Sequence, residues 1–490
     1  MIVYLKQITK NFIVNDWLAA KFFLLVLVVY CVWYGFEVSH GWVFNLPNYQ
    51  TLIQVLLLFA FVDGLRCSIE SLFPRTFVEA SDETGDITVI IPTVNGEKVL
   101  PETIRDLVAR FDRENIIVVS NGSMDRTAAV AQEFGVRVLD IKAPIGKVGA
   151  IHEGLSRVRT KYTMLIDDDT RLGVALFPMH ALENGCEGVA FRVLPYVNDW
   201  ITALQMYEYR KSMDLSKPHQ NWSKTVQNVS GAVGVFHTTE LTRQLDTHSG
   251  EFSGEDLQRT LLIHASAHTQ GVVISDAVVF TEVPDSFRSL WKQRVLGWNP
   301  GMYANFGLYI KVLFAKHTPW LLRVDAFYNT VLVSGLDIFR LLLFPVVIFY
   351  PVVALLFYIL YLLLELLPYV ALGKTRGPLW VIFITPIYGM INFVARAAAA
   401  FVFTYRRLAV RFGGYAEKDD YRKAGVRVRL GAYATSAWIC AVVFSGLIVN
   451  ASPEINLSLD FELLSEAMIN VGDKIKAGAN AIFDLSAISG

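Results

Sequence analysis

The sequence has few cysteines, few charged residues and almost no net charge. Its four cysteines stand far apart in 490 residues, and none belongs to a Cys-x-x-Cys pair. A disulfide framework or a zinc site is therefore not expected. Charged residues make up 18% of the chain and the formal net charge is -1, so the charge balance does not indicate a nucleic-acid partner. The nine histidines form no His-Glu-x-x-His pair, and we interpret them as structural or surface residues.

Long apolar runs are abundant instead, and they gather towards the two ends of the chain. Hydrophobic residues make up 53% of the sequence and the mean hydropathy is +0.40. This balance excludes a disordered chain, a coiled coil and an ordinary soluble enzyme. Runs near 20 residues predict membrane-spanning helices. The runs lie at 18–36, 49–65, 341–367, 378–404 and 430–449.

Two of these runs can be interpreted in another way. The first could be a cleaved signal peptide, although it lacks a cleavage site of small residues. The run at 341–367 contains Pro345 and Pro351, so it is either one kinked span or a re-entrant hairpin.

Basic residues predict how the chain is oriented in the membrane. Eight Lys or Arg residues lie in 405–429, whereas 37–49 has none, and basic loops mark the cytoplasmic side. We therefore expect a multi-pass protein of the inner or plasma membrane with a cytoplasmic catalytic domain. The expected parts are a cytosolic N-terminus (1–16), two transmembrane helices (17–65), a cytosolic domain (66–320), about three spans (321–450) and an extracytoplasmic tail (451–490).

The middle of the chain has the pattern of an α/β domain. Short apolar runs at 88–91, 116–119, 162–166 and 272–280 predict buried strands. Helical patterns at 100–111 and 126–134 lie between them. The alternation predicts a largely parallel sheet with right-handed crossovers.

Several motifs in this domain carry polar groups suited to chemistry. Asp167, Asp168 and Asp169 follow the strand at 162–166 directly. Three adjacent carboxylates suit a hard divalent cation, although a solvated acidic turn is the other interpretation. On an extended segment Asp167 and Asp169 would share one side. Lys147 opens a helical pattern, and a cation at a helix N-terminus suits phosphate.

Other motifs are ambiguous when taken singly. Asp256 and Glu255 precede a helical pattern, where a carboxylate is either a helix cap or a general base. The small residues at 230–234 either let the backbone approach a ligand or pack against a helix. Trp298 is a candidate ligand contact or an interfacial anchor.

Taken in order, these motifs resemble those of the membrane-embedded family 2 glycosyltransferases, the group of hyaluronan, chitin, cellulose and poly-N-acetylglucosamine synthases. The resemblance covers residues 85–300 by motif. It rests on Ile90–Glu97 for the opening strand and loop, Asn121-Gly122-Ser123 for the nucleotide-binding turn, Gly146-Lys147, Asp167–Asp169, Ser230-Gly231-Ala232, Glu255-Asp256 and the region from Thr281 to Trp298.

The resemblance implies a GT-A type (Rossmann-like) cytosolic domain inserted between transmembrane segments, and roles for individual residues. Asp256 would be the general base, and Asp167 and Asp169 would hold Mg²⁺ or Mn²⁺. The nucleotide-sugar site would comprise Thr93, Asn95, Glu97, Asn121, Lys147, Asp167 and Arg294. The acceptor site would comprise Ser230, Gly231, Glu255 and Trp298.

The sequence departs from the family pattern at two places. Asn121 stands where the family usually has Asp, which removes a charge near the base of the nucleotide. The segment 293–298, Gln-Arg-Val-Leu-Gly-Trp, is one residue longer than the family's Q-x-x-R-W. Gly297 replaces the arginine that precedes the tryptophan, and Arg294 is the nearby candidate to supply its charge.

The resemblance implies inverting transfer of a sugar from a nucleotide diphosphate sugar, with a UDP-sugar favoured over a GDP-sugar. The favoured acceptor is a growing polysaccharide that the C-terminal spans export, so membrane lipids are also partners. Two alternatives stay open: single addition to a lipid-linked acceptor, and a membrane scaffold with a degenerate domain. The carboxylates Asp167, Asp169 and Asp256 argue against the scaffold.

Overall fold

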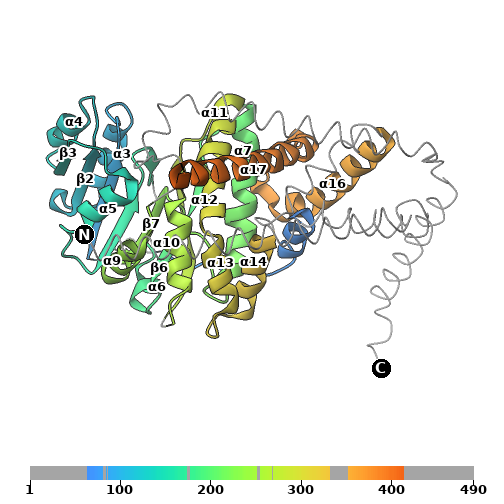
Figure 1. Ribbon diagram of the computed structural model, residues 1–490, viewed down its shortest axis with the longest axis horizontal. Helices are drawn as coiled ribbons and strands as arrows, with labels where there is room; N and C mark the ends of the chain where they lie inside the picture. Colours follow the sequence, from blue (N-terminus) through green and yellow to red (C-terminus); the bar gives the residue numbers. More distant parts are fainter. Residues whose placement is uncertain are drawn as a thin grey trace. The chain divides into compact units, whose positions relative to one another are not determined.

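The computed structural model describes residues 63–80, 84, 86–173, 177–250, 254–267, 269–331 and 351–412 (Figure 1). They belong to one compact unit, Met1–Ala441, and the second unit, Val442–Gly490, lies outside the described residues. The predicted spans at 18–36 and 430–449, the predicted tail, and all of the run at 49–65 except its last three residues also lie outside.

An eight-stranded sheet forms the centre of the described fold. Its strand order is β3-β2-β1-β4-β7-β6-β8-β5. The strands are β1 (Ile87–Thr93), β2 (Ile116–Asn121), β3 (Arg137–Ile141), β4 (Tyr162–Ile166), β5 (Thr170–Arg171), β6 (Gly188–Pro195), β7 (Val233–His237) and β8 (Val272–Thr281). Every residue of β1, β2 and β4 is buried, which is why these strands read as short continuous apolar runs.

The structure confirms the predicted strands and corrects the predicted sheet. β1 pairs in parallel with β2 and β4, β2 with β3, and β6 with β8. However, β7 is antiparallel to both β4 and β6, and β5 is antiparallel to β8. The sheet is therefore mixed. The reversal occurs where β7 inserts between strands that come earlier in the chain, and strand periodicity does not report such an insertion.

Helices α3 (Leu100–Val108), α4 (Thr127–Glu133) and α5 (Gly146–Leu155) follow β1, β2 and β3 and cover this part of the sheet (Figure 1). The first two match the predicted helical patterns, although each ends earlier than expected. Helix α5 lies close to the strands at Gly154, where an added Cβ would come within 2.8 Å of the Ile90 side chain. A glycine here lets the C-terminal part of α5 pack closely against β1 and β2.

The second half of the domain adds further helices around the sheet. They are α6 (Met179–Glu183), α7 (Trp200–Lys211), α8 (Lys217–Asn221), α9 (Thr238–Thr247) and α10 (Glu255–His264). A π-helical turn, η3 (Ser212–Ser216), joins α7 to α8. After β8 come α11 (Phe287–Lys292), the π-helical η4 (Gln293–Trp298), α12 (Asn299–Ala304), α13 (Phe306–Phe314) and α14 (Trp320–Val331).

Two long apolar helices follow, α16 (Pro351–Ala371) and α17 (Trp380–Phe412). Among the described residues, one segment, Trp380–Thr404 in α17, is long and apolar enough to cross a membrane. α17 packs against α7, α12 and η4 (Figure 1). It continues to Phe412, so the first eight residues of the predicted basic loop are helical and the rest of that loop lies outside the described residues.

Candidate active site

The loops that follow β1 and β2 are tied to each other by side chains. The Asn95 side-chain oxygen accepts a hydrogen bond from Met124 N at 2.8 Å, and Glu97 accepts one from Arg126 N at 3.1 Å. Asn121 is buried, and its side-chain oxygen accepts a hydrogen bond from Ile145 N at 2.8 Å. Three residues predicted to bind the nucleotide therefore use these atoms to shape the loops.

The three aspartates after β4 do not form an extended segment. Asp167 O accepts a hydrogen bond from Thr170 N at 3.2 Å, which closes a turn. The three side chains consequently have different partners: Lys147 for Asp167, Thr93 for Asp168 and Thr281 for Asp169. We expected Asp167 and Asp169 to share a side because side chains alternate along an extended strand. The backbone forms a turn here, so that expectation rested on the wrong backbone geometry.

Burial raises the pKa of all three carboxyl groups, that of Asp167 to about 6. The pKa values rise because burial deprives the charged carboxylates of hydration, and Lys147 offsets only part of that effect. The described residues contain no group of three or more His, Cys, Asp or Glu side chains arranged to hold a metal ion.

Lys147 forms ion pairs with two segments of the site, the turn after β4 and the first turn of α10. Its ammonium lies 2.7 Å from Asp167 Oδ1 and 2.7 Å from Glu255 Oε1. The Glu255 carboxyl is buried, which favours its neutral form, but Lys147 and Arg259 outweigh burial and hold its pKa at about 2. The predicted phosphate-binding lysine is thus placed between the strand end of β4 and the N-terminus of α10.

Asp256 is held firmly in the first turn of α10. Its Oδ2 accepts hydrogen bonds from Gly231 N at 3.0 Å and from Asn228 Nδ2 at 3.2 Å. The N-cap position is Gly254, whose φ of 99° is left-handed and which makes no side-chain cap. Asp256 is therefore not the N-cap, and its carboxylate is oriented by the loop that precedes β7.

The predicted acceptor residues Gly231 and Glu255 lie together with Lys147 and Asp256. An added Cβ at Gly231 would lie 3.3 Å from Glu255 Oε1, 3.5 Å from Lys147 Nζ and 3.6 Å from Asp256 Oδ2. The hydroxyl of Ser230 accepts a hydrogen bond from Ala232 N at 3.3 Å. Three charged groups therefore converge on this glycine, which has no side chain to hold them apart.

The π-helical turn η4 absorbs the extra residue of the segment 293–298. A π-helix closes hydrogen bonds from residue i to i+5 and arises as a one-residue bulge in an α-helix. Trp298 ends this turn, 41% exposed, with its ring centroid 6.3 Å from that of Tyr209. Its backbone oxygen lies near Gly254, so the end of η4 stays next to the start of α10 despite the insertion.

Arg294 contacts the helices next to the domain. Its guanidinium lies 2.6 Å from Glu208 in α7, and Tyr388 in α17 donates a hydrogen bond to the same carboxylate at 2.7 Å. The other face of the guanidinium lies 4.2 Å above the Trp298 ring. No hydrogen bond or ion pair joins Arg294 to Lys147 or Asp167 among the described residues, so its role at the diphosphate stays a prediction.

Sequence reasoning missed three residues that complete this site. Asn228 orients Asp256 through a hydrogen bond. The charges of Arg294, Asp169 and Asp256 act on the hydroxyl group of Tyr209. Arg259 is a buried residue of α10, 4.8 Å above the Phe236 ring, and its charge acts on Glu255 and Asp256. Arg259 could have been found from its place one turn after Glu255-Asp256, but nothing in the sequence distinguishes Tyr209 or Asn228.

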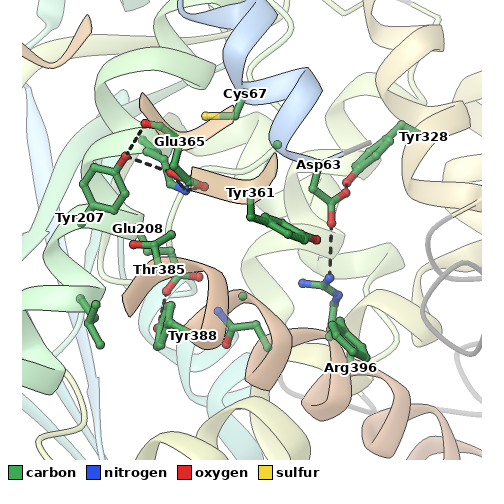
Figure 2. Close-up of a pocket in the computed structure, with 16 residues that line it drawn as sticks. Asp63, Cys67, Tyr207, Glu208, Tyr328, Tyr361, Glu365, Thr385, Tyr388 and Arg396 are labelled. Atoms are coloured by element: carbon green, nitrogen blue, oxygen red, sulfur yellow. Dashed lines mark hydrogen bonds and ion pairs between the residues drawn. The ribbon is translucent and has the colours of Figure 1, made fainter. Parts of the chain in front are cut away.

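A polar cavity of about 300 Å³ lies beyond the Arg294–Glu208 pair (Figure 2). Glu208 and Tyr388 form part of its wall, and α16 and α17 contribute Tyr361, Glu365 and Arg396. Charged side chains in apolar helices indicate function. Lys211 neutralises Glu365 at 2.7 Å, so the lining is polar without a large net charge.

Comparison with known proteins identifies the class of the domain. Residues 88–179 match the model of glycosyl transferase family 2. The chain is 22% identical over 228 residues to poly-beta-1,6-N-acetyl-D-glucosamine synthase of Staphylococcus aureus (strain COL), covering 44% of this chain and 54% of that protein. The synthase of the same name from Staphylococcus epidermidis is 22% identical over 239 residues, covering 46% and 57%. The chain therefore spans about half the length of the curated relatives it matches.

A solved structure has a similar fold. The mannosyltransferase PcManGT from Pyrobaculum calidifontis, in complex with GDP-Man and Mn²⁺, has a TM-score of 0.50 and 13% identity, covering 73% of this chain and 97% of that chain. The fold is accordingly of the GT-A, Rossmann-like α/β type. Residues 88–179 therefore form a family 2 glycosyltransferase domain, and the chain around it is similar to enzymes of the polysaccharide synthase type.

Proposed function

We propose that the protein transfers a sugar, with inversion, from a nucleotide diphosphate sugar to a growing polysaccharide, and that the polymer leaves across the membrane. The observation that carries this proposal is the convergence of Lys147 and Asp256 at Gly231, beside the carboxyl end of β4. A cation that can meet a diphosphate and a carboxylate that can take a proton are both needed for a single displacement.

The donor would lie along the carboxyl ends of β1, β2 and β4, where open α/β sheets bind nucleotides. Asp167 and Asp169 would supply oxygen ligands to Mg²⁺ or Mn²⁺, and the diphosphate would complete the shell. This donor set fits by its chemistry, because carboxylate oxygens are the ligands that hard divalent cations prefer, and both carboxyl groups follow the carboxyl end of β4. The metal, when bound, would stabilise the charge of the leaving diphosphate.

The chain's own residues would perform the remaining steps. Asp256, fixed by Gly231 N and Asn228, would accept the proton of the acceptor hydroxyl as that oxygen attacks the anomeric carbon. Lys147 would leave its bridge to Glu255 and contact the diphosphate. The exposed Trp298 ring would stack on the acceptor sugar.

The cavity whose wall includes Glu208, the ion-pair partner of Arg294, supports the export of a polymer. It adjoins α17, whose segment Trp380–Thr404 can span a membrane. The predicted multi-pass arrangement is part of this proposal. A single addition to a lipid-linked acceptor would use the same active site but would not need the cavity.

The test is to incubate the purified full-length protein with labelled UDP- and GDP-sugars. The proposal predicts transfer from one donor, a ladder of long products, loss of transfer in EDTA and recovery with Mg²⁺ or Mn²⁺. Products with one added sugar would instead support the lipid-linked alternative. Full activity in EDTA would remove the metal assignment, and no transfer from any donor would contradict the proposed function.

A further inference from the structure

The loop before β7 carries the two donors that orient the Asp256 carboxylate. Asn228 Nδ2 lies 3.2 Å and Gly231 N lies 3.0 Å from Asp256 Oδ2. A loop lacks the regular ladder of hydrogen bonds that fixes a strand, so the place of these donors depends on how the loop is anchored. The residue directly before Asn228 is Gln227, and contacts that fix Gln227 therefore also fix Asn228.

The side chain of Gln220, in α8, anchors the start of this loop. It is buried, its Oε1 accepts a hydrogen bond from Gln227 N at 3.3 Å, and its Nε2 donates to Asp325 Oδ2 at 3.1 Å. A backbone N–H can only donate and a carboxylate can only accept, so one orientation of the amide satisfies both partners. Gln220 thus ties the residue next to Asn228 to helix α14.

A second side chain of α14 reaches the same residue. Asn329 Nδ2 donates a hydrogen bond to Gln227 Oε1 at 2.9 Å and another to Asp325 O, one turn earlier in the helix, at 3.0 Å. Gln227 is therefore held through its backbone by Gln220 and through its side chain by Asn329. Both contacts lead back to α14, and together they restrain the loop in position and in rotation.

Asp325 is itself fixed by Arg66, which belongs to the helical residues 63–70. Arg66 Nη2 lies 2.7 Å from Asp325 Oδ1, and Arg66 Nε lies 2.8 Å from Glu70 Oε1. The Asp325 side chain is 13% exposed, so this ion pair is screened less than one at the surface. With Oδ1 held by the guanidinium, Oδ2 is placed to accept from Gln220.

We propose that Gln220 is a positioning residue for the general base, acting on Asp256 through Gln227 and Asn228. A general base must lie within hydrogen-bond reach of the proton that it takes. A small displacement of the base therefore lowers the rate of transfer even when the substrates still bind. This inference rests on the proposed function, and it adds the contact through which α8 and α14 hold the base in place.

The first experiment measures transfer by the full-length protein, with the labelled donor sugar that the wild type uses, and nucleotide binding with UDP and GDP. Gln220→Met keeps a side chain of similar size but removes both hydrogen bonds. We expect kcat to fall roughly fivefold to thirtyfold, the effect of one or two lost hydrogen bonds. The KM for the donor and the Kd of the nucleotide should change by less than about twofold, because Gln220 acts on the base and not on the donor.

A double-mutant cycle with Asn228→Ala tests the route from Gln220 to the base. Asn228→Ala removes the side-chain donor to Asp256 and should lower kcat by itself. If Gln220 acts through Asn228, adding Gln220→Met to this variant should lower kcat by less than about threefold further. Losses that multiply in full would overturn the proposal, because Gln220 would then act on the rate independently of Asn228.

An exchange of polar groups between Gln220 and Asp325 should rescue the rate. Gln220→Glu places a second carboxylate against Asp325 and should lower kcat at least as much as Gln220→Met. Adding Asp325→Asn supplies an amide that can donate to the new carboxylate and still accept from Arg66, so kcat should return to within about threefold of the wild type. This pair of variants also decides the matter if Gln220→Met does not fold.

Gln244→Met is the matched control. Gln244 is a fully buried glutamine of α9 whose Nε2 donates to Glu240 at 3.2 Å, so its replacement should lower the unfolding temperature but leave kcat within about twofold of the wild type. A wild-type kcat in Gln220→Met, an equal loss of kcat and nucleotide affinity, or no rescue by the exchange would overturn the proposal. A wild type that transfers no sugar, or a fully active Asp256→Asn, would count against the proposed function instead.

Discussion

In the proposed reaction, single residues divide the candidate site into a donor side and an acceptor side. Lys147 and Asp167 lie on the first, and Asp256, Asn228 and Trp298 lie on the second. Glu255 connects the two through its ion pair with Lys147 at 2.7 Å. A donor whose diphosphate attracts Lys147 would break the ion pair between Lys147 and Glu255. Donor binding would therefore leave a carboxylate on the acceptor side without this cation.

Replacing Lys147 with Met should therefore weaken donor binding. The diphosphate would lose a cation, and Asp167 and Glu255 would repel it. We expect at least a tenfold rise in the dissociation constant of the nucleotide, measured by calorimetric titration, with Lys147→Arg in between. Unchanged nucleotide affinity in Lys147→Met would show that the lysine has a structural role only. Lys142→Met, at a lysine that is 86% exposed, is the control.

His264 should make the domain less stable as the pH falls. It is buried, its ring donates a hydrogen bond to Val226 O at 2.9 Å, and burial lowers its pKa from 6.5 to about 4. The unfolded chain therefore binds a proton more readily. The contribution, about 3 kcal/mol, is fully present above pH 6.5 and is lost as the pH falls towards 4.

Thermal unfolding followed between pH 7 and pH 4 measures this effect. His264→Asn keeps a neutral donor and should flatten the decline, whereas His180→Asn, at an exposed histidine, should not. If His264→Asn and the wild type decline in parallel, the loss of stability comes from other groups.

At the scale of elements, the π-helical turn η4 positions Trp298 and Arg294 together. The guanidinium is fixed between the Trp298 ring and Glu208 of α7. Trp298, on which the acceptor is proposed to stack, is thereby linked through Arg294 to Glu208 in the wall of the polar cavity. The sequence showed the extra residue in 293–298, but not that a wide turn would absorb it.

Arg294→Ala should remove most of the transfer activity, and Arg294→Lys should restore only part of it, because an ammonium lacks the planar fork of a guanidinium. If the arginine acts through Glu208, Glu208→Gln should lower activity too. The double variant should then be no worse than Arg294→Ala alone. Additive losses would indicate that Arg294 contacts the donor directly, and an active Arg294→Ala enzyme with products of normal length would contradict both roles.

The strands could be predicted because each is a short apolar run bounded by polar turns, as in Tyr162–Ile166. The order of the sheet could not be, since the antiparallel β7 is placed by long-range contacts. Likewise, Asp256 and Lys147 were recognisable from motifs. Asn228 was not, because its contact with Asp256 arises from the packing of distant segments.

At the scale of the whole molecule, the predicted orientation in the membrane can be tested by labelling. The two positions chosen for single-cysteine variants, Gly414 and Ser486, lie outside the described residues. The prediction for them rests on the basic residues of 405–429. In a cysteine-free background, an impermeant reagent applied from outside should label Ser486→Cys and not Gly414→Cys. Labelling at position 414 would reverse the assignment of the spans.

The central claim is that Asp256 is the general base of a sugar transfer. The most direct measurement is the rate of labelled sugar transfer by wild type and by Asp256→Asn, together with their affinities for the nucleotide. Asparagine keeps the size of the side chain and can still accept a hydrogen bond from Gly231 N, but it cannot take the proton. The account predicts a rate lower by about 10²- to 10⁴-fold with nucleotide affinity nearly unchanged. Wild-type turnover by Asp256→Asn would contradict it.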